Sequence, residues 1–479
     1  MLKTPRHNRD DAGLSILYEN ELIMISNILN IPELCGLDTR HDLVRIPPEL
    51  DIPLTARVRR IIDSQAFRRL ATVSQLGLVS LVYPAARHTR FEHSLGVYRI
   101  ALLFLKQIAH DQRFSELLTV HHAETFIVAA LLHDLGHWPF CHPMEDLNLS
   151  GLPKHEQYAE QHIADAEIAD LLRDDWGIDP HEVVALINRQ GTDAPTNLLI
   201  SVLSGPIDID KMDYLFRDSL HAGVPYGRHF DQGRLIGSLC LNERGDGLAI
   251  TDKGKTAAEL MVFARYVMFS EVYWHHSVRC ATAMLQRAFY LMLDRLDFAL
   301  CSRQGDSQMI GRLLDISRGT ESHELFDRLF GVRRRLYKRV AQYGILEQPE
   351  LYRLLAGKPY PFLCRCAEQL TEMLNRQGHR VSDDTNGTRA LLPTDLLIDA
   401  PPVEKEVEFR IDVFYPKERC YRPLETVSPV VRALAREQFD DYVKRVRIFA
   451  PTELARQLRD NTHFSEQLAE VLQKSEPQS

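Results

Sequence analysis

Apolar positions recur at helical spacing over most of the first 300 residues. In Leu54–Leu78 apolar side chains follow one another every three or four residues with basic residues between them, the pattern of an amphipathic helix. Ala257–Leu296 is long for one helix, so we expect one bent helix or two in succession. No repeat of fixed period occurs, so no solenoid is expected. The same helical pattern is found in Leu95–Ile108, Ala123–Leu132 and His155–Leu172.

Strand patterns are concentrated in the second half of the chain. Glu406–Val413 alternates between polar and apolar residues, and Val446–Phe449 is a short apolar run. Gly245–Gly254 is expected to form a small hairpin between helical regions, and Ser382–Arg389 is rich in turn residues. We therefore predict a mainly α fold with a helical core and a C-terminal α+β lobe.

The expected organisation has four parts along the 479 residues. Residues 1–45 form an N-terminal extension without a clear motif, and residues 46–300 form the helical core. Residues 301–472 form the C-terminal lobe, and residues 473–479 a frayed tail.

Composition narrows the class of protein. With 45% hydrophobic and 26% charged residues, the chain is typical of a soluble globular protein, and its net charge of -9 argues against a dedicated nucleic-acid coat. The eight cysteines form no CxxC pair, so neither a structural zinc site nor a disulfide framework is indicated. No apolar leader and no run of 18 apolar residues occur, so we expect a cytoplasmic protein with no membrane contact.

One segment carries a candidate metal motif. Leu131–His142 reads LLHDLGHWPFCH, in which His133 and Asp134 offer one nitrogen and one oxygen ligand at the end of an apolar helix. Mixed imidazole and carboxylate donors suit Fe, Mn, Zn, Ni or Co better than Ca. Two further ligands are needed, and His93 in RFEHSLG and Asp210 in IDIDKMDY are the candidates. Such a set leaves positions open for water and a phosphate oxygen.

A His-Asp dipeptide alone is weak evidence, because most such dipeptides are structural. His41-Asp42 and His110-Asp111 are two more in this chain, and neither has comparable neighbours. The metal interpretation depends on the conjunction of several motifs.

The ordered motifs RFEHSLGV, HDLGHWPFCH, KHEQ and DIDKMDYLFRD resemble the HD-domain dNTP triphosphohydrolases. The likeness is greatest to the enzymes that combine a SAM domain with an HD domain, although this sequence carries no SAM domain. It is strong over residues 55–280 and includes DSQAFRRLATVSQLG at Asp63–Gly77. The resemblance implies hydrolysis of a dNTP at the α-phosphorus, giving deoxynucleoside and inorganic triphosphate, in a homo-oligomer such as a dimer or tetramer.

The resemblance also implies roles for individual residues. The metal would be held by His93, His133, Asp134 and Asp210, with Mg²⁺ accompanying the triphosphate. Glu145 is expected to accept the N–H of His142 and fix its tautomer. His142 is then the expected general acid at the 5′ oxygen. The residues implied to line the α-phosphate are His137, His142, Glu145 and His155.

A second implied set binds the substrate. Arg90 and Lys211 would grip the phosphates and Arg265 would reach the γ-phosphate. Gln75 would bond the 3′-hydroxyl, while Leu76 fills the space that a 2′-hydroxyl needs. The full set is Gln75, Leu76, Arg90, Lys211, Tyr214, Asp218, Arg265 and Tyr273.

Several neighbours receive a structural interpretation. Asp213 is expected to form an ion pair with Arg217, and Asp208 to cap a helix or support Asp210. Five further histidines are expected on the surface or satisfied in the core: His88, His121, His122, His275 and His276.

Regulation and base preference are left open. Trp274 stands where the family has a polar residue that contacts the base. Arg68, Ala71, Glu271 and His276 differ from the family's activator-binding residues, so constitutive activity and activation by a different nucleotide are both retained.

Two other functions remain as alternatives. An HD-type nucleotidase, cyclic-nucleotide phosphodiesterase or alarmone hydrolase would share the metal site without needing the Gln75–Leu76 pair. A protein that binds single-stranded nucleic acid through an inherited HD fold would not turn substrate over. The intact metal and phosphate positions argue against that second alternative.

Overall fold

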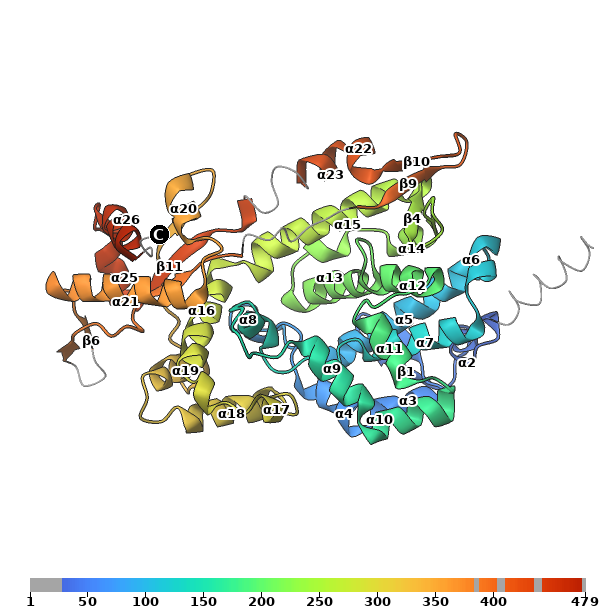
Figure 1. Cartoon of the computed structure of the whole chain (residues 1–479), viewed down its shortest axis with the longest axis horizontal. Coiled ribbons are helices and arrows are strands. Elements are labelled where there is room, and N and C mark those ends of the chain that lie inside the picture. The colour runs from blue at the N-terminus through green and yellow to red at the C-terminus, as the bar shows by residue number, and fades with distance from the viewer. Residues whose placement is uncertain (1–27, 383–386, 403–409, 435–441, 476–479) are drawn as a thin grey trace, which may run out of the picture.

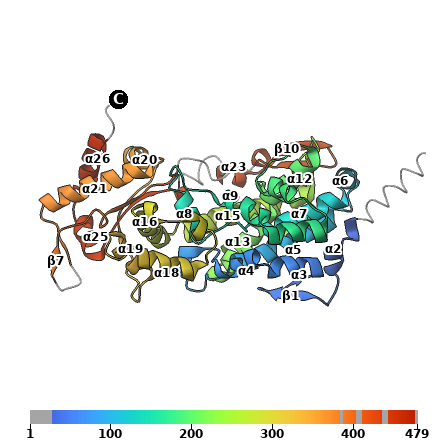
Figure 2. The ribbon, with the colours of Figure 1, turned by 60° about the horizontal axis from the view of Figure 1, so that its bottom comes forward.

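The computed structural model describes residues 28–382, 387–402, 410–434 and 442–475. They form an elongated molecule with a helical core at one end and a C-terminal lobe at the other, and both views in Figures 1 and 2 keep the two ends apart. The helix α16 (His276–Tyr290) runs between them, with buried residues along nearly its whole length. The predicted mainly α fold with small sheets is confirmed.

The core is built around α5, α7 and α13. Helix α5 packs against both α7 and α13, and α7 is apolar and buried on almost every side. The core helices are α2 (Pro32–Gly36), α3 (Ala56–Asp63), α4 (Gln65–Arg69), α5 (Arg90–Ile108), α6 (Gln112–Leu117), α7 (Val120–Leu132), α8 (Cys141–Glu145), α9 (His155–Ala164), α10 (Ala166–Leu171), α11 (Pro180–Ile187), α12 (Ala194–Ser204), α13 (Ile209–Ala222), α14 (Gln232–Ile236) and α15 (Lys255–Met268).

Two small sheets belong to the core. One is the antiparallel hairpin β1 (Leu43–Ile46) and β2 (Leu50–Pro53). The other has the order β10-β9-β4-β3, in which β9 pairs in parallel with β4 and places Val413 opposite Ile250. Residues 410–434 therefore return from the C-terminal half onto the core (Figure 1). The elements are β3 (Leu239–Leu241), β4 (Leu248–Thr251), β9 (Asp412–Tyr415), β10 (Cys420–Pro423), α22 (Leu424–Val427) and α23 (Pro429–Ala433).

The C-terminal lobe surrounds an antiparallel sheet of order β5-β11-β8. Every residue of its central strand β11 is buried, and helices α21, α25 and α26 contribute to the same apolar cluster. Its elements are α17 (Phe298–Cys301), α18 (Asp306–Ile316), α19 (Ser322–Phe330), β5 (Lys338–Tyr343), α20 (Pro349–Leu355), α21 (Tyr360–Arg376), β6 (Val381–Ser382), β7 (Thr388–Arg389), β8 (Leu397–Asp399), β11 (Val446–Ala450), α25 (Thr452–Arg459) and α26 (Phe464–Ser475).

The predicted elements differ from the observed ones mainly at their breaks. Ala257–Leu296 contains two successive helices, α15 and α16, separated by a π-helical turn at Phe269–Tyr273. Leu54–Leu78 is interrupted at Ser64, whose hydroxyl caps α4 by accepting the Phe67 N–H. The hairpin predicted over Gly245–Gly254 is displaced toward the N-terminus, because it pairs β3 (Leu239–Leu241) with β4 (Leu248–Thr251) and only β4 lies in the predicted range. The strand at 446–449 is confirmed.

Some predictions fall on residues that are not described. Most of the strand expected at 406–413 lies outside the described residues, and β9 begins only at Asp412. Residues 1–27 of the expected extension also lie outside them. Within the described ranges, no helix combines the length and apolarity needed to cross a bilayer.

Candidate metal centre and active site

Three helix ends bring the four expected metal ligands together. Helix α5 begins after Thr89, whose hydroxyl accepts the Glu92 N–H, and it carries His93 in its first turn. The apolar α7 ends at His133, which Asp134 follows. Helix α13 begins after Asp208 and has Asp210 in its first turn. Because α5 packs on both other helices, these ends converge in one place.

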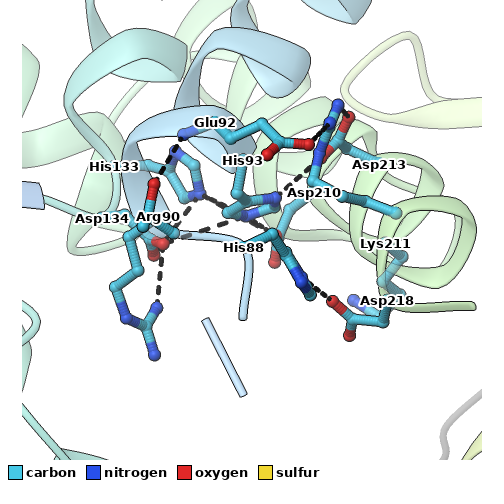
Figure 3. A network of polar contacts seen from close by, with 12 residues as sticks. His88, Arg90, Glu92, His93, His133, Asp134, Asp210, Lys211, Asp213 and Asp218 are labelled. Atoms are coloured by element: carbon cyan, nitrogen blue, oxygen red, sulfur yellow. Dashed lines mark hydrogen bonds and ion pairs between the residues drawn. The ribbon is translucent and has the colours of Figure 1, made fainter. Parts of the chain in front are cut away.

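The distances among these side chains fit one divalent cation. The Nε2 atoms of His93 and His133 are 3.2 Å apart, and Asp210 Oδ1 lies 3.1 Å from His93 Nε2 and 3.8 Å from His133 Nε2 (Figure 3). Asp134 Oδ1 lies 3.5 Å from His133 Nε2. Ligands held at about 2.0–2.2 Å from one ion are roughly 3–3.5 Å from one another. We call these four residues the His/Asp cluster.

The second ring nitrogen of each histidine fixes the tautomer. His93 donates from Nδ1 to Asp213 Oδ2 at 2.8 Å, and His133 donates from Nδ1 to the Ala130 carbonyl at 2.9 Å. With the proton on Nδ1, the lone pair of Nε2 points into the cluster, as metal ligation requires. The donor set therefore fits an ion of the Fe, Mn, Zn, Ni or Co class.

A buried network supports His93 from behind. Asp213 accepts two hydrogen bonds from Arg217, each 2.7 Å, so the predicted ion pair is present and also orients a ligand. Arg217 is 1% exposed and donates onward to Glu92 at 2.6 Å, which also accepts from His221. A Cβ at Gly96 would lie 1.9 Å from Asp213 Oδ1, so only glycine leaves room for this pair.

The carboxylate of Asp134 is held in its charged form. Arg90 donates from Nη1 to Asp134 Oδ2 at 2.8 Å, and His137 Nδ1 lies 3.1 Å from Oδ1. Burial alone would raise the pKa of Asp134, but the adjacent His137 ring and the guanidinium of Arg90 hold it well below its usual range. Asp134 is therefore a charged carboxylate at physiological pH.

A second group of three histidines lies beside this cluster. His137 follows α7, His142 lies on α8 and His155 begins α9; we call them the imidazole trio. One ring nitrogen of each lies within 4.8 Å of one nitrogen of each of the others. Gly136 permits this approach, because a Cβ there would lie 2.1 Å from the His155 carbonyl oxygen.

The contact expected between Glu145 and His142 is not formed. Glu145 Oε2 is 3.9 Å from His142 Nδ1, beyond hydrogen-bonding distance. Instead Glu145 accepts the backbone N–H of His155 at 2.8 Å and its Nδ1–H at 2.9 Å. The chain between α8 and α9 brings His155 back beside Glu145. The spacing of Glu145 from His142 along the sequence did not indicate this contact.

Burial and positive charge disfavour the cationic form of the trio. Burial, followed by the charge of Arg90, lowers the pKa of His137 well below its usual value. The same causes, in the same order, lower the pKa of His142 to about 4. The side chain of His142 is 56% exposed, so we give the Arg90 charge more weight than burial for this residue. Both rings are therefore neutral at physiological pH.

Asp218 and Tyr273, two of the expected substrate residues, are hydrogen-bonded to each other. Tyr273 donates to Asp218 Oδ2 at 2.6 Å, and His88 donates from Nε2 to Asp218 Oδ1 at 2.8 Å. His88 stacks on His221 with ring centroids 4.4 Å apart, which ties Asp218 to the network behind His93. His88 was expected to be surface or satisfied core; it is buried, and its Nδ1 has no partner among the described residues.

The other expected substrate residues surround these groups. The Gln75 N–H donates to the His88 carbonyl at 3.0 Å, while its buried side-chain Oε1 has no partner among the described residues. Lys211 donates to Asp208 Oδ2 at 2.5 Å and to the Gly205 carbonyl at 3.0 Å, so its ammonium is held within α13's own N-terminus. The remaining members of this set are Leu76 and Tyr214, packed against the core cluster, and Arg265, whose guanidinium lies over the Phe269 ring.

A basic cavity of about 1040 Å³ lies between α16 and β5, and His276 is in its wall. Of the residues in this wall, only His276 was considered from the sequence. The positive charge of the RRRLYKR stretch at residues 333–339 was not identified. Its basic lining residues are Arg328, Arg334, Arg335, Lys338, Arg339, Arg389 and Arg459.

Comparison with known proteins agrees with this architecture. The HD domain family matches residues 90–216, a range that contains all four members of the His/Asp cluster, and the HD associated region matches residues 230–475. An uncharacterized protein of Methanocaldococcus jannaschii is 30% identical over 415 residues, which cover 86% of this chain and 79% of that protein. A crystal structure of a hypothetical protein from Aquifex aeolicus matches with a TM-score of 0.65 and 26% identity, over 87% of this chain and 98% of that one.

A further relative has a named activity. The deoxynucleoside triphosphate triphosphohydrolase SAMHD1 of Gallus gallus is 29% identical over 300 residues, which cover 56% of this chain and 47% of that protein. This chain thus spans about half of that relative's length. From its HD domain, its HD-associated region and its His/Asp cluster, the chain belongs to the HD-domain family and is a metal-dependent phosphohydrolase of that family.

Proposed function

We propose that this protein hydrolyses deoxynucleoside triphosphates at the α-phosphorus, releasing a deoxynucleoside and inorganic triphosphate. The observation that carries the proposal is the short stretch of residues 88–93, which reaches three different groups in succession (Figure 3). A nucleotide offers the matching groups, a sugar and phosphate oxygens that a guanidinium and a metal ion can both bind. The contacts are His88 with Asp218, Arg90 with Asp134, and His93 with Asp210.

The phosphate end of the site would be bound by charge and by neutral rings. Arg90 is buried and held by one nitrogen on Asp134, while its Nε has no partner among the described residues. A guanidinium fixed in this way is suited to bind a phosphate oxygen with little reorganisation. When bound in the His/Asp cluster, a divalent ion supplies Lewis-acid polarisation and a more acidic water.

His142 is proposed as the proton donor to the departing 5′ oxygen. Its ring is the exposed member of the imidazole trio, and His137 Nε2 lies 3.2 Å from its Nε2. The ring is neutral in the free protein, and the negative charge of an arriving triphosphate would raise its pKa. Substrate binding would thereby supply the proton that the leaving alkoxide needs.

The sugar would be recognised by two hydrogen-bonding groups and one apolar side chain. The Oε1 of Gln75, which has no partner among the described residues, is an acceptor for the 3′-hydroxyl, and Asp218 is fixed by Tyr273 and His88. Leu76 would fill the position of a 2′-hydroxyl. A buried hydroxyl without a partner costs on the order of 1–3 kcal/mol, enough to favour deoxyribose over ribose.

Product identification tests the proposal. The purified full chain is incubated with Mn²⁺ or Mg²⁺ and each of the four dNTPs, singly and mixed, and products are separated by ion-exchange chromatography. We expect deoxynucleoside and tripolyphosphate in equal amounts. Tripolyphosphate from the mixture but not from single dNTPs would show activation by a second nucleotide.

Other products would overturn the assignment. Pyrophosphate or monophosphate would move the cleavage away from the α-phosphorus and favour another HD-type nucleotidase or phosphodiesterase. Salt-dependent binding of single-stranded nucleic acid without turnover would favour the non-enzymatic alternative. The matched control is His121→Ala, because His121 is a histidine on the same helix that leads to His133 and pairs with Glu182 away from the site.

A further inference from the structure

The imidazole trio has the geometry of a second cation site. His137 Nε2 and His142 Nε2 are 3.2 Å apart, the same separation as the two Nε2 atoms of the His/Asp cluster. The ring of His155 lies 4.0 Å from that of His137 and 5.3 Å from that of His142, centroid to centroid. Nitrogens bound to one ion at about 2.0–2.1 Å lie roughly 3–3.5 Å apart, so small rotations of the rings would complete a three-nitrogen site.

The contacts of the trio direct ring nitrogens toward one another. Glu145 accepts the Nδ1–H of His155 at 2.9 Å, which leaves the lone pair of that ring on Nε2. A carboxylate behind a histidine in this way is the arrangement that orients imidazole ligands in metal sites. The Nε2 atoms of His137 and His142 face each other, so each of the three rings offers a nitrogen to the same space.

The donor types separate this site from the His/Asp cluster. The cluster offers two nitrogens and two carboxylates, whereas the trio offers three nitrogens. Imidazole donors suit Zn²⁺, Cu²⁺, Ni²⁺ and Co²⁺, while Mg²⁺ and Ca²⁺ prefer oxygen. The buried guanidinium of Arg90 opposes a second positive charge nearby, so the trio would bind its ion more weakly than the carboxylate-rich cluster.

We propose that His137, His142 and His155 bind a second cation of the zinc class, and that this ion inhibits turnover by occupying the His142 nitrogen. The inhibitory part rests on the proposed role of His142 as proton donor; the binding part does not. An imidazole that ligates a metal through its lone pair has no proton to give at that nitrogen. Zinc in excess of the first equivalent would then inhibit the enzyme, whereas Mg²⁺ would not.

Zinc counting tests the binding part. Metal-free full-length protein is dialysed against buffered Zn²⁺ at increasing concentration, and bound zinc is measured by mass spectrometry. We expect wild type and His121→Ala to bind one more zinc than His142→Ala and His155→Ala, with the extra zinc binding at the higher concentration. His133→Ala should retain the weaker site, and the His133→Ala, His142→Ala double variant should lose both.

Zinc bound by other side chains, such as the cysteines, is common to all of these variants. A difference in zinc count between variants therefore reports on the trio. Equal zinc counts in wild type, His142→Ala and His155→Ala would overturn the proposal. Because His142 is 56% exposed, its replacement leaves the packing intact, and circular dichroism melting checks this. Co²⁺ in place of Zn²⁺ gives a second readout, since its visible spectrum reports coordination number directly.

Turnover with zinc tests the inhibitory part. With Mn²⁺ present, half-inhibition should occur at the zinc concentration that fills the weaker site. His155→Ala, measured against its own lower zinc-free rate, should need at least about tenfold more zinc for the same fractional loss. Unchanged sensitivity in His155→Ala would overturn the inhibitory part. If no dNTP is hydrolysed under any condition, the proposed function fails, while the zinc counts still decide whether the trio binds a cation.

Discussion

Two neighbouring groups of imidazoles have the same internal spacing but opposite electrostatic surroundings. In the His/Asp cluster the ring nitrogens face two carboxylates, and the pKa of Asp134 is held well below its usual range. In the imidazole trio the Nε2 atoms of His137 and His142 face each other, and burial together with the charge of Arg90 lowers the pKa of His137. The carboxylates of Asp134 and Glu145 lie at the opposite nitrogens of the His137 and His155 rings. Donor spacing alone therefore does not define a site: the charges around equivalent rings decide whether a cation, a phosphate or a proton is favoured.

The largest expected effect comes from removing a ring of the His/Asp cluster. His133→Ala takes away one of four donors, so Mn²⁺ affinity should fall by more than the roughly 10–100-fold typical of lost supporting contacts, and turnover should disappear. Electron paramagnetic resonance of free Mn²⁺ measures the affinity. His121→Ala, on the same helix, is the control. Unchanged Mn²⁺ affinity in His133→Ala would show that the His/Asp cluster is not the metal site.

Removing a ring of the trio should separate chemistry from metal binding. His142→Gln abolishes the proposed proton donor, so kcat should fall by about 10²–10⁴-fold while Mn²⁺ affinity stays at the wild-type value. Steady-state kinetics and the same Mn²⁺ titration measure the two quantities. A parallel loss of both would mean that the two groups of imidazoles act as one site.

The contact behind His93 should have a smaller effect on the His/Asp cluster. Asp213→Asn keeps the shape of the side chain but weakens its bonds to His93 and Arg217, so Mn²⁺ affinity should fall by about 10–100-fold. Thermal melting accompanies the titration, because Arg217 is left with an incomplete partner in a buried place. Unchanged affinity together with a lowered melting temperature would assign Asp213 a purely structural role.

The smallest expected effect lies at the sugar end, away from both groups. Tyr273→Phe removes one hydrogen bond to Asp218, whose other oxygen is still bound by His88. A typical net contribution of about 0.5–1.5 kcal/mol corresponds to a loss of about 2–10-fold in kcat/KM for a dNTP. Competition between deoxynucleotide and ribonucleotide substrates measures whether sugar discrimination falls as well; no change in either would place Tyr273 outside the substrate site.

The helical core could be predicted because its signals are local. Apolar periodicity acts within a few residues, so it predicted α7 before His133 and most of α5, whose first turn with Arg90 and His93 lay outside the predicted range. For α13, Asp208 was expected only as a possible helix cap. The pairing of β9 with β4 could not be anticipated in the same way. It joins Val413 to Ile250, and no local pattern identifies a strand's distant partner.

The site shows the same limit. Spacing along α8 suggested Glu145 as the partner of His142, but the carboxylate binds His155, which the chain brings back from the next helix. His88 was assigned no function because a single histidine carries little information, yet its contact with Asp218 links the proposed sugar-binding residues to the rest of the site. Helical spacing did identify the Asp213–Arg217 pair, since the two residues are one turn apart.

One contact of Arg217 bears on how the protein reaches its working form. Its guanidinium also donates to the carbonyl of Pro47 at 3.3 Å, in the turn between β1 and β2. The two residues are 170 positions apart, so this bond closes a very large loop of chain. One of the bonds that hold the Arg217 guanidinium, and through Asp213 the ring of His93, is therefore made by the first hairpin. A change in that hairpin is expected to weaken metal binding although it touches no metal ligand.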